Sequence, residues 1–352
     1  TPRGYERGTE RYPVLYMTDG DAHLVHTRGT VDFLARNGRM PDLIVVGVAN
    51  THRTRDLTPT KVSRLRADGR VFLDEETGGA TRFLEFIEKE LIPFVEGRYR
   101  TAPFRILAGH SLGGLFALGA LVERPGLFGA TIAVSPTLHW DEDVVLGRLS
   151  AFLDGRKELR HTVYVTIANE EEGEPAPTRF DRLRKMLKAT KAEGFVWGSE
   201  RMEDEDHGSV VLRSHYDGLR KVFEGWRLPR DRGAGGYPGS LAKMKAHYST
   251  LSGRLGYEVT PPEGIVNAVG YQHLQRNEVK RALPFFRWNA ELHPGSANVH
   301  DSLGEALEAA GEMAEALSCY EKAVELGRKA FDPNLAVYER NRDRAARPEA
   351  AR

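Results

Sequence analysis

The sequence predicts an α/β fold, with a mostly parallel central sheet covered by helices on both faces, followed by a small all-α region of helical repeats. Between about residues 12 and 226, short apolar runs alternate with longer amphipathic runs. This alternation is typical of strand–helix–strand units with right-handed crossovers. Between about residues 262 and 326 the pattern is helical throughout and repeats after about 34 residues, the length of a tetratricopeptide repeat.

The expected strands are apolar almost throughout, which is typical of parallel strands that are buried on both faces. We expect strands over 13–17, 43–49, 104–108, 130–134, 162–168 and 195–201. We expect helices over 30–37, 81–97, 112–124, 143–153, 179–192 and 210–226. Within 81–97, residues recur at helical spacing and predict one buried face, namely Phe83, Phe86, Ile87, Leu91 and Phe94.

The helical repeat brings like residues together when the chain is shifted by one period. The matched pairs are Gly270 with Gly304, Ala282 with Ala316, Leu283 with Leu317, Phe286 with Tyr320 and Leu292 with Leu326. Two repeats are fewer than the three usually needed for an independent array. We therefore expect these helices to pack on the preceding domain or on a second copy, as a possible homodimer or protein contact.

The predicted boundaries give an α/β domain over 1–228, a linker or covering segment over 229–261, the repeat region over 262–340 and a flexible tail over 341–352. Residues 230–239 are rich in glycine and charge and show no periodicity, which favours a linker. The alternative is that this segment covers the active site.

Composition excludes several classes of protein. The chain has 352 residues, with 50 Lys and Arg against 50 Asp and Glu, which argues against nucleic acid or an anionic membrane as the main partner. The longest apolar run, about 43–49, is too short to span a membrane. The single cysteine, Cys319, excludes an intrachain disulfide framework. The chain begins at Thr1 without Met or a leader, so we expect a trimmed N-terminus and a soluble protein, cytoplasmic or exported.

The motif with the clearest chemistry is Gly-His-Ser-Leu-Gly over 109–113, between an apolar strand and a helix. In a nucleophile elbow the serine takes strained backbone angles, and the flanking glycines let strand and helix approach closely. Ser111 is therefore the candidate nucleophile. The alternative is a glycine-rich turn with a chance serine.

A serine hydroxyl needs a base within hydrogen-bond reach and a carboxylate to orient that base. His207 follows the last expected strand on a loop, at the sheet edge where open α/β sheets place their sites. Three glutamates follow the preceding strand at 170–172, and we prefer Glu171 as the acid, with Glu172 and Glu170 behind it. A Ser–His dyad without a required acid is the alternative, and an ordinary surface loop histidine is the structural alternative for His207.

A tetrahedral intermediate needs two preorganised donors for its oxyanion. One donor is expected at the backbone N–H of Leu112, the residue after the nucleophile. The second is expected in the loop after the first strand, at the N–H of Asp21. A simple Asp-Gly turn that ends the strand is the alternative there.

Four further residues are candidates for substrate binding. Arg53 and Arg55 follow the second strand and suit an anionic or phenolic group; the alternative is pairing with Asp56 and nearby carboxylates. Trp140 follows the fourth strand, where it lines a pocket or serves as a packing anchor. His110 lies inside the elbow and alternatively packs locally. No metal-ligand spacing such as H-E-x-x-H is present, so we expect no metal and no cofactor.

Taken together, these segments resemble the "Putative esterase" family of α/β-hydrolases, which contains esterase D-type, feruloyl-type and enterochelin esterase-type enzymes and mycolyltransferases. The resemblance rests on 11–20, 50–56, 109–114, 135–136 and 206–209 and covers about residues 5 to 226. It implies an α/β-hydrolase fold and serine esterase chemistry, with Ser111 as nucleophile and His207 as base, and it supports the Asp21 N–H as an oxyanion donor. Family members often have Gly where this chain has Ala168.

The leading hypothesis is therefore a serine carboxylic ester hydrolase that acts on a small-molecule ester through an acyl-enzyme. An acyltransferase with the same triad is one alternative, and an esterase specific for siderophore or feruloyl esters is another. A non-enzymatic scaffold, with the helical region as a peptide-binding module, is disfavoured because Ser111 and His207 are both intact.

Overall fold

The computed structural model describes residues 1–7, 10–62, 76–170, 178–229 and 240–347. The chain divides into two units, which are described separately. The first comprises Thr1–Arg227 together with Arg254–Tyr257, and the second comprises Leu228–Gly253 and Glu258–Arg352.

The first unit is built on a six-stranded parallel sheet of order β2-β1-β3-β4-β5-β6. The strands are β1 (Tyr12–Met17), β2 (Ile44–Gly47), β3 (Thr101–His110), β4 (Ala130–Val134), β5 (Glu158–Ala168) and β6 (Glu193–Met202). All the strands expected from the apolar runs are confirmed. β3, β5 and β6 extend beyond the predicted bounds because their ends carry polar residues that nevertheless join the backbone ladder.

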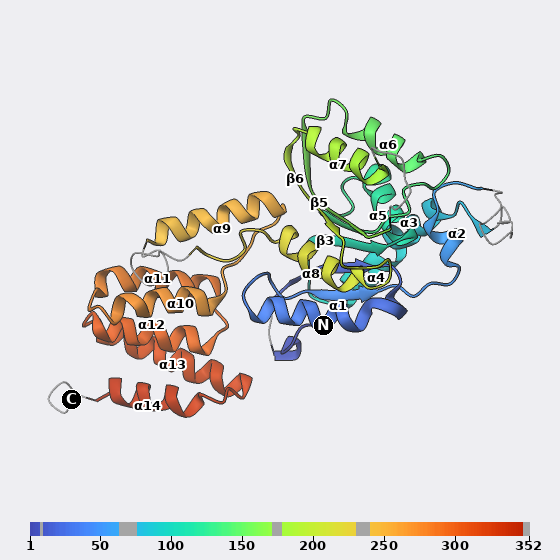
Figure 1. Cartoon of the computed structure of the whole chain (residues 1–352). Coiled ribbons are helices and arrows are strands. Elements are labelled where there is room, and N and C mark those ends of the chain that lie inside the picture. Colours follow the sequence, from blue (N-terminus) through green and yellow to red (C-terminus); the bar gives the residue numbers. More distant parts are fainter. Residues whose placement is uncertain (8–9, 63–75, 171–177, 230–239, 348–352) are drawn as a thin grey trace. The chain divides into compact units, whose positions relative to one another are not determined.

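Helices cover both faces of this sheet, as predicted (Figure 1). The helices α1 (Gly20–Arg36) and α8 (Val210–Val222) pack together on one face, and α5 (Leu112–Glu123), α6 (Val144–Leu153) and α7 (Arg179–Ala189) lie on the other. Successive side chains of β5 point to opposite faces of the sheet, and both sets are covered. Val163, Val165 and Ile167 join the core beneath α6 and α7, whereas the Thr166 hydroxyl bonds Ser214 of α8 at 2.8 Å.

One predicted helix contains an irregular turn. The segment expected over 81–97 is continuous but consists of α3 (Ala80–Phe86), a π-turn (Ile87–Leu91) and α4 (Ile92–Arg98). Pro93 lies at the start of α4 and has no N–H to donate to the preceding turn, so the backbone hydrogen bonds shift register there. The described residues of the first unit also include the short helices η1 (Tyr5–Arg7) and α2 (Arg53–Leu57).

The strand order places the chain reversal between β1 and β3. From β1 the chain runs outward to β2 and then returns to β3 on the other side of β1. The helices that follow these two neighbours, α1 and α5, therefore leave the same sheet edge toward opposite faces. In open α/β sheets, ligand sites lie in the crevice at such a reversal.

The second unit is helical, as predicted, and Figure 1 shows its helices as a stack. They are α9 (Leu241–Leu255), α10 (Glu263–Leu274), α11 (Val279–Leu292), α12 (Ala297–Ala309), α13 (Met313–Ala330) and α14 (Leu335–Ala345). Two boundaries differ from expectation. The predicted linker contains α9, whose Met244, Tyr248 and Leu251 are buried. The predicted tail begins inside α14, where Asn341 is buried and donates to Asp301 at 3.0 Å.

The repeat corresponds to two helix pairs with equivalent contacts. In the first pair, a Cβ atom added to Gly270 of α10 would lie 2.7 Å from the Phe286 ring of α11. In the second, a Cβ atom added to Gly304 of α12 would lie 2.6 Å from the Tyr320 ring of α13. Glycine is required at both positions because the aromatic ring of the next helix lies directly on the backbone.

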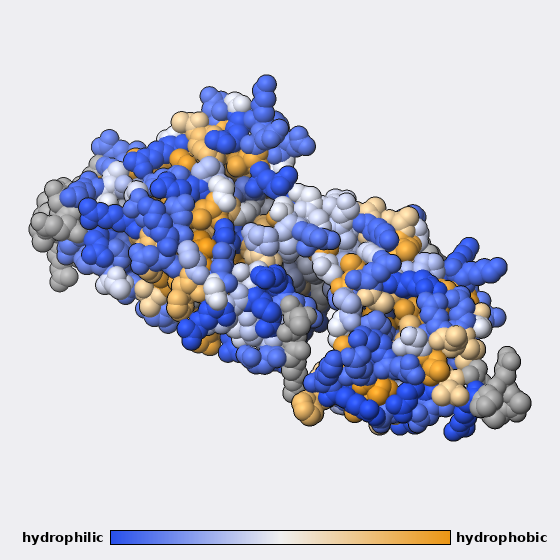
Figure 2. Space-filling model, turned by 180° about the vertical axis from the view of Figure 1, so that it is seen from behind, coloured by the Kyte–Doolittle hydropathy of each residue, from blue (hydrophilic) through white to orange (hydrophobic). Residues whose placement is uncertain are grey.

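Hydrophilic residues predominate on the face shown in Figure 2, where apolar residues appear in scattered groups. Among the described residues, none of the helices combines the length and the apolar character needed to cross a membrane.

Two buried histidines of the first unit make its stability depend on pH. Burial lowers the pKa of His161 on β5 to about 4 and that of His215 on α8 to about 3. Below pH ~6.5 the unfolded chain therefore binds more protons than the folded chain. The free energy of unfolding should be insensitive to these groups above that pH and should fall on the order of 2 kcal/mol per histidine by pH 5. Urea unfolding at several pH values measures this.

His161→Gln is the matched variant, because an amide can keep a hydrogen bond with Thr131, whose hydroxyl lies 2.9 Å from His161 Nε2. The variant should lose less free energy of unfolding than wild type between pH 7 and pH 5. Equal losses in the two proteins would contradict this account of His161.

Candidate active site

Ser111 lies at the sharp turn between β3 and α5, with backbone angles of φ 58° and ψ −117°. A non-glycine residue in this region is strained by roughly 1–3 kcal/mol and persists only where its surroundings hold it. The Ser111 N–H donates to the Val134 carbonyl at 2.9 Å, and the Ser111 carbonyl accepts from the Thr137 N–H at 3.2 Å. These bonds to the end of β4 and the turn after it fix the elbow that the motif predicts.

The two glycines of the motif permit the close contact between strand and helix. A Cβ atom at Gly109 would collide with the backbone of Gly113. A Cβ atom at Gly113 would collide with the Thr18 hydroxyl and lie 3.2 Å from a carboxylate oxygen of Asp19. The elbow therefore touches both its own strand and the turn that follows β1.

His207 lies on the loop between β6 and α8, and its Nδ1 is in hydrogen-bond contact with the Glu170 carboxylate. Glu170 follows β5, and the two loops are joined by a hydrogen bond from the Asn169 N–H to the Glu205 carbonyl at 3.0 Å. The structure thus brings Glu170, one of the two glutamates ranked behind Glu171 as the acid, to His207. Glu171, the preferred acid, lies outside the described residues, as does Glu172.

The Glu170 carboxylate is held in its charged form. Burial by itself would raise its pKa, but hydrogen bonds from His207 and Ser135 outweigh burial and hold the pKa below its ordinary value. Ser135 is itself fixed, since its hydroxyl accepts the Ala168 N–H at 3.1 Å. A charged Glu170 suits the stabilisation of a positively charged His207 imidazolium.

A second histidine packs against His207. The His110 ring centroid lies 4.6 Å from that of His207 and 5.6 Å from that of His23 on α1. Burial, together with the neighbouring His207 and His23, lowers the pKa of His110 to about 4. His110 is therefore neutral at pH 7 and contacts the base, which agrees with the local packing role considered for it.

Two backbone N–H groups lie at helix N-termini, one in the elbow and one after the turn that follows β1. Asp21 is in the first turn of α1 and Leu112 is in the first turn of α5. The neighbouring Gly20 N–H is occupied by the Val48 carbonyl at 2.9 Å, whereas in the described part of the chain neither the Asp21 nor the Leu112 N–H has a backbone acceptor. N–H groups in the first turn of a helix lack intrahelical partners and are available to an anion.

The three remaining candidate substrate contacts have structural partners. Arg53 pairs with Asp19, with Nε–Oδ1 2.6 Å, and Arg55 pairs with Asp56, with Nε–Oδ1 2.8 Å. Trp140 is buried in the core beneath α6. For all three the structure supports the structural alternatives, namely ion pairing for the arginines and packing for the tryptophan.

Among the described residues, the Ser111 hydroxyl forms its side-chain hydrogen bond with Thr137 Oγ1, at 3.2 Å, and not with His207. Catalytic hydrogen bonds in ligand-free enzymes are often long or misaligned and tighten on binding.

Sequence reasoning missed Thr137, Ser135 and Asp19. Each stands within a few residues of the end of a predicted strand, and Asp19 and Ser135 also lie in the segments that carry the family resemblance.

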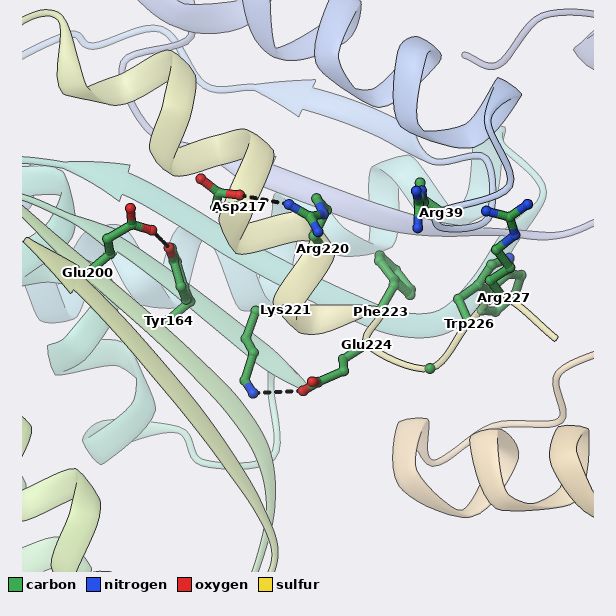
Figure 3. Close-up of a pocket in the computed structure, with 11 residues that line it drawn as sticks. Arg39, Tyr164, Glu200, Asp217, Arg220, Lys221, Phe223, Glu224, Trp226 and Arg227 are labelled. Atoms are coloured by element: carbon green, nitrogen blue, oxygen red, sulfur yellow. Dashed lines mark hydrogen bonds and ion pairs between the residues drawn. The ribbon is translucent and has the colours of Figure 1, made fainter. Parts of the chain in front are cut away.

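A pocket of about 440 Å³ lies elsewhere on the first unit, between β5, β6 and the C-terminal half of α8 (Figure 3). Its charges are largely paired with each other: Tyr164 donates to Glu200 at 3.1 Å, and Lys221 pairs with Glu224 at 2.7 Å. It includes none of the residues described above and is separate from the candidate active site.

An elbow serine, a histidine–glutamate pair and two N–H donors without a backbone acceptor among the described residues lie after parallel strands, an arrangement typical of serine hydrolases of the α/β class. The family model described as "Putative esterase" matches residues 1–217, and the chain belongs to this family.

Two curated relatives and one solved structure support this assignment. The ferri-bacillibactin esterase BesA of Bacillus subtilis is 34% identical over 57% of this chain and 75% of that protein. The siderophore triacetylfusarinine C esterase of Aspergillus fumigatus is 33% identical over 63% of this chain and 85% of that protein. The IroE-like serine hydrolase from Shewanella oneidensis superposes with a TM-score of 0.70 at 29% identity, covering 82% of this chain and 92% of that one. The protein is an esterase.

The elbow contact predicts that Gly113→Ala will be damaging, because the new Cβ would collide with the Thr18 hydroxyl. We expect a loss of roughly 1–3 kcal/mol in the free energy of unfolding, as in overpacked cores, and a lower esterase rate. Gly119→Ala, on the same helix but with open space around its Cβ, is the control and should be neutral or stabilising. Equal behaviour of the two variants in urea unfolding would refute the close contact.

Proposed function

We propose that this esterase acts through a Ser111–His207–Glu170 triad, with the backbone N–H groups of Leu112 and Asp21 as its oxyanion hole. The observation that carries the proposal is the contact between His207 Nδ1 and the Glu170 carboxylate, with the His207 ring packed against His110, the residue before the strained elbow serine. This contact fixes the imidazole tautomer, so that Nε2 is the basic nitrogen available to the serine.

In the acylation step, Ser111 Oγ attacks the ester carbonyl carbon while His207 Nε2 accepts the hydroxyl proton. The carbonyl oxygen becomes an oxyanion and accepts hydrogen bonds from the Leu112 and Asp21 N–H groups. The carbon–oxygen bond to the alcohol then breaks, and His207 returns the proton to the leaving alkoxide. In the second step, water attacks the acyl-enzyme by the same route and releases the acid and the free serine.

Glu170 stabilises the imidazolium that forms in both steps and does not itself become protonated. Its lowered pKa, which results from the hydrogen bonds of His207 and Ser135 against the effect of burial, supports this role. The neutral His110 packs against the base without adding a competing positive charge.

We further propose that the substrates are the ester bonds of a siderophore. One relative, at 33% identity, is named a siderophore esterase and another, at 34%, a ferri-bacillibactin esterase, and they are matched over 85% and 75% of their lengths. The helix ends next to the site also expose apolar side chains, which suits a large substrate with apolar parts. Val25 near the start of α1 is 87% exposed, and Leu212 in the first turn of α8 is 53% exposed.

The test of the triad compares wild type with Ser111→Ala and His207→Ala on p-nitrophenyl acetate and on the siderophore enterobactin. Each variant should lose at least about 10⁴-fold in kcat, because nucleophile and base act as a unit. Spectrophotometry follows the first substrate and chromatography the second. Turnover that survives in Ser111→Ala would exclude the mechanism, and a wild type that cleaves only p-nitrophenyl acetate would exclude the siderophore substrate.

Glu170→Gln separates a triad from a dyad. A glutamine keeps the size of the side chain but removes the charge and disturbs the imidazole tautomer, so kcat should fall roughly 10²–10⁴-fold. The control is Glu203→Gln. Glu203 precedes His207 in the same part of the chain and has an exposed carboxylate, whose Oε1 lies 3.8 Å from Arg201 Nε. A Glu170→Gln rate within about threefold of wild type would exclude Glu170 as the acid and leave a Ser–His dyad or one of the other two glutamates.

A further inference from the structure

The Arg53 guanidinium bridges two segments that the chain keeps far apart in sequence. Its Nε and Nη2 donate to the two carboxylate oxygens of Asp19, at 2.6 Å and 3.1 Å, in the turn after β1. The same Nη2 also donates to the backbone carbonyl of His110, the last residue of β3, at 3.2 Å. Arg53 itself is the first residue of α2, so three segments meet at one side chain.

The Asp19 side chain is buried and is held by contacts besides the one with Arg53. It is 4% exposed and has a left-handed backbone, with φ 55°. Although it stands at the N-cap of α1, its carboxylate does not cap the helix and instead accepts from Arg53 and from Asn50 Nδ2, the latter at 2.5 Å. Burial would raise its pKa, but hydrogen bonds from Arg53 and Asn50 and the Arg53 charge hold that pKa low.

Each of the two residues that accept hydrogen bonds from Arg53, Asp19 and His110, lies at the same short distance in sequence before one of the two proposed N–H donors. Asp21 follows Asp19 by two residues, and Leu112 follows His110 by two residues. The Asp19 carboxylate also lies 3.2 Å from where a Cβ of Gly113 would stand, so the two turns are in contact. The distance between the two donors therefore depends on this contact and on the Arg53 bridge.

We propose that Arg53 is a positioning residue of the oxyanion hole, which sets the separation and direction of the Asp21 and Leu112 N–H groups by clamping Asp19 to the His110 carbonyl. The inference rests on the proposed function and assigns Arg53 a role through the backbone, not through contact with substrate. A planar guanidinium fixes both distance and angle through its forked bonds, which the point charge of a lysine cannot do.

An oxyanion hole is effective because its donors are already in place before charge develops. A donor displaced by about 1 Å costs on the order of 10²-fold in rate, even when the substituted residue never touches the substrate. Loosening the clamp should therefore lower kcat and leave the binding of an uncharged ester nearly unchanged.

The experiment measures kcat and KM of wild type, Arg53→Lys, Asp19→Asn and the double variant on p-nitrophenyl acetate and on the anionic ester mono-p-nitrophenyl succinate. Lysine keeps a positive charge beside the buried Asp19, so the chain should fold, which circular dichroism verifies. We expect kcat to fall roughly 10–10²-fold in each single variant on both esters, with KM changed less than about threefold. The double variant should fall no further than the worse single variant, because both break one clamp.

Arg36→Lys, in the pair with Asp32 at the far end of α1, is the control for a surface arginine and should match wild type. Inhibition by an alkylboronic acid, which forms a tetrahedral adduct on serine, gives a second readout, and its inhibition constant should rise in parallel with the loss in kcat.

The result that overturns the clamp is an Arg53→Lys variant with unchanged kcat, or one whose only effect is a higher KM for the anionic ester, since this would place Arg53 on the substrate. Ser111→Ala is measured in parallel. If wild-type turnover persists without Ser111, the proposed function fails; if turnover needs Ser111 but not Arg53, only the clamp fails.

Discussion

The active site depends on the close approach of two backbones where β3 turns into α5. A Cβ atom on Gly109 would collide with the Gly113 backbone, and one on Gly113 would collide with the Thr18 hydroxyl, so neither position tolerates a side chain, and Ser111 between them is held in a strained conformation. The N–H and carbonyl of Ser111 are tied to β4 and to the turn after it, so the elbow belongs to the sheet and not to a loop. Rigid support of this kind keeps a strained residue in place without help from a ligand.

The acid Glu170 and the base His207 are held by strands other than those that hold Ser111. Glu170 and His207 follow the adjacent strands β5 and β6, and a backbone hydrogen bond between Asn169 and Glu205 joins their two loops. The pair is also tied to the support of the nucleophile, because Ser135, between the residues that hold Ser111, bonds Glu170 and accepts the Ala168 N–H at 3.1 Å.

Much of the fold could be predicted because it depends on apolar patterning, which the sequence displays directly. The strands, the elbow and the loop position of His207 followed from runs such as 104–108 and from the Gly-x-Ser-x-Gly spacing. The acid was harder, because three adjacent glutamates are equivalent in sequence. What brings Glu170 to His207 is a turn in which the Glu170 N–H folds back on the Ala168 carbonyl at 2.9 Å. The partner of Arg53 was equally hidden, since Asp19 belongs to another turn and meets it only after the sheet has formed.

The contacts between glycines and aromatic rings in the second unit bear on how this unit can evolve. Each contact joins one helix to the next along the chain, Gly270 to Phe286 and Gly304 to Tyr320, and needs no distant residue. A duplication or deletion of one whole period would therefore leave every other contact of this kind intact. The length of this region can change during evolution by whole repeats, independently of the sheet that carries the chemistry.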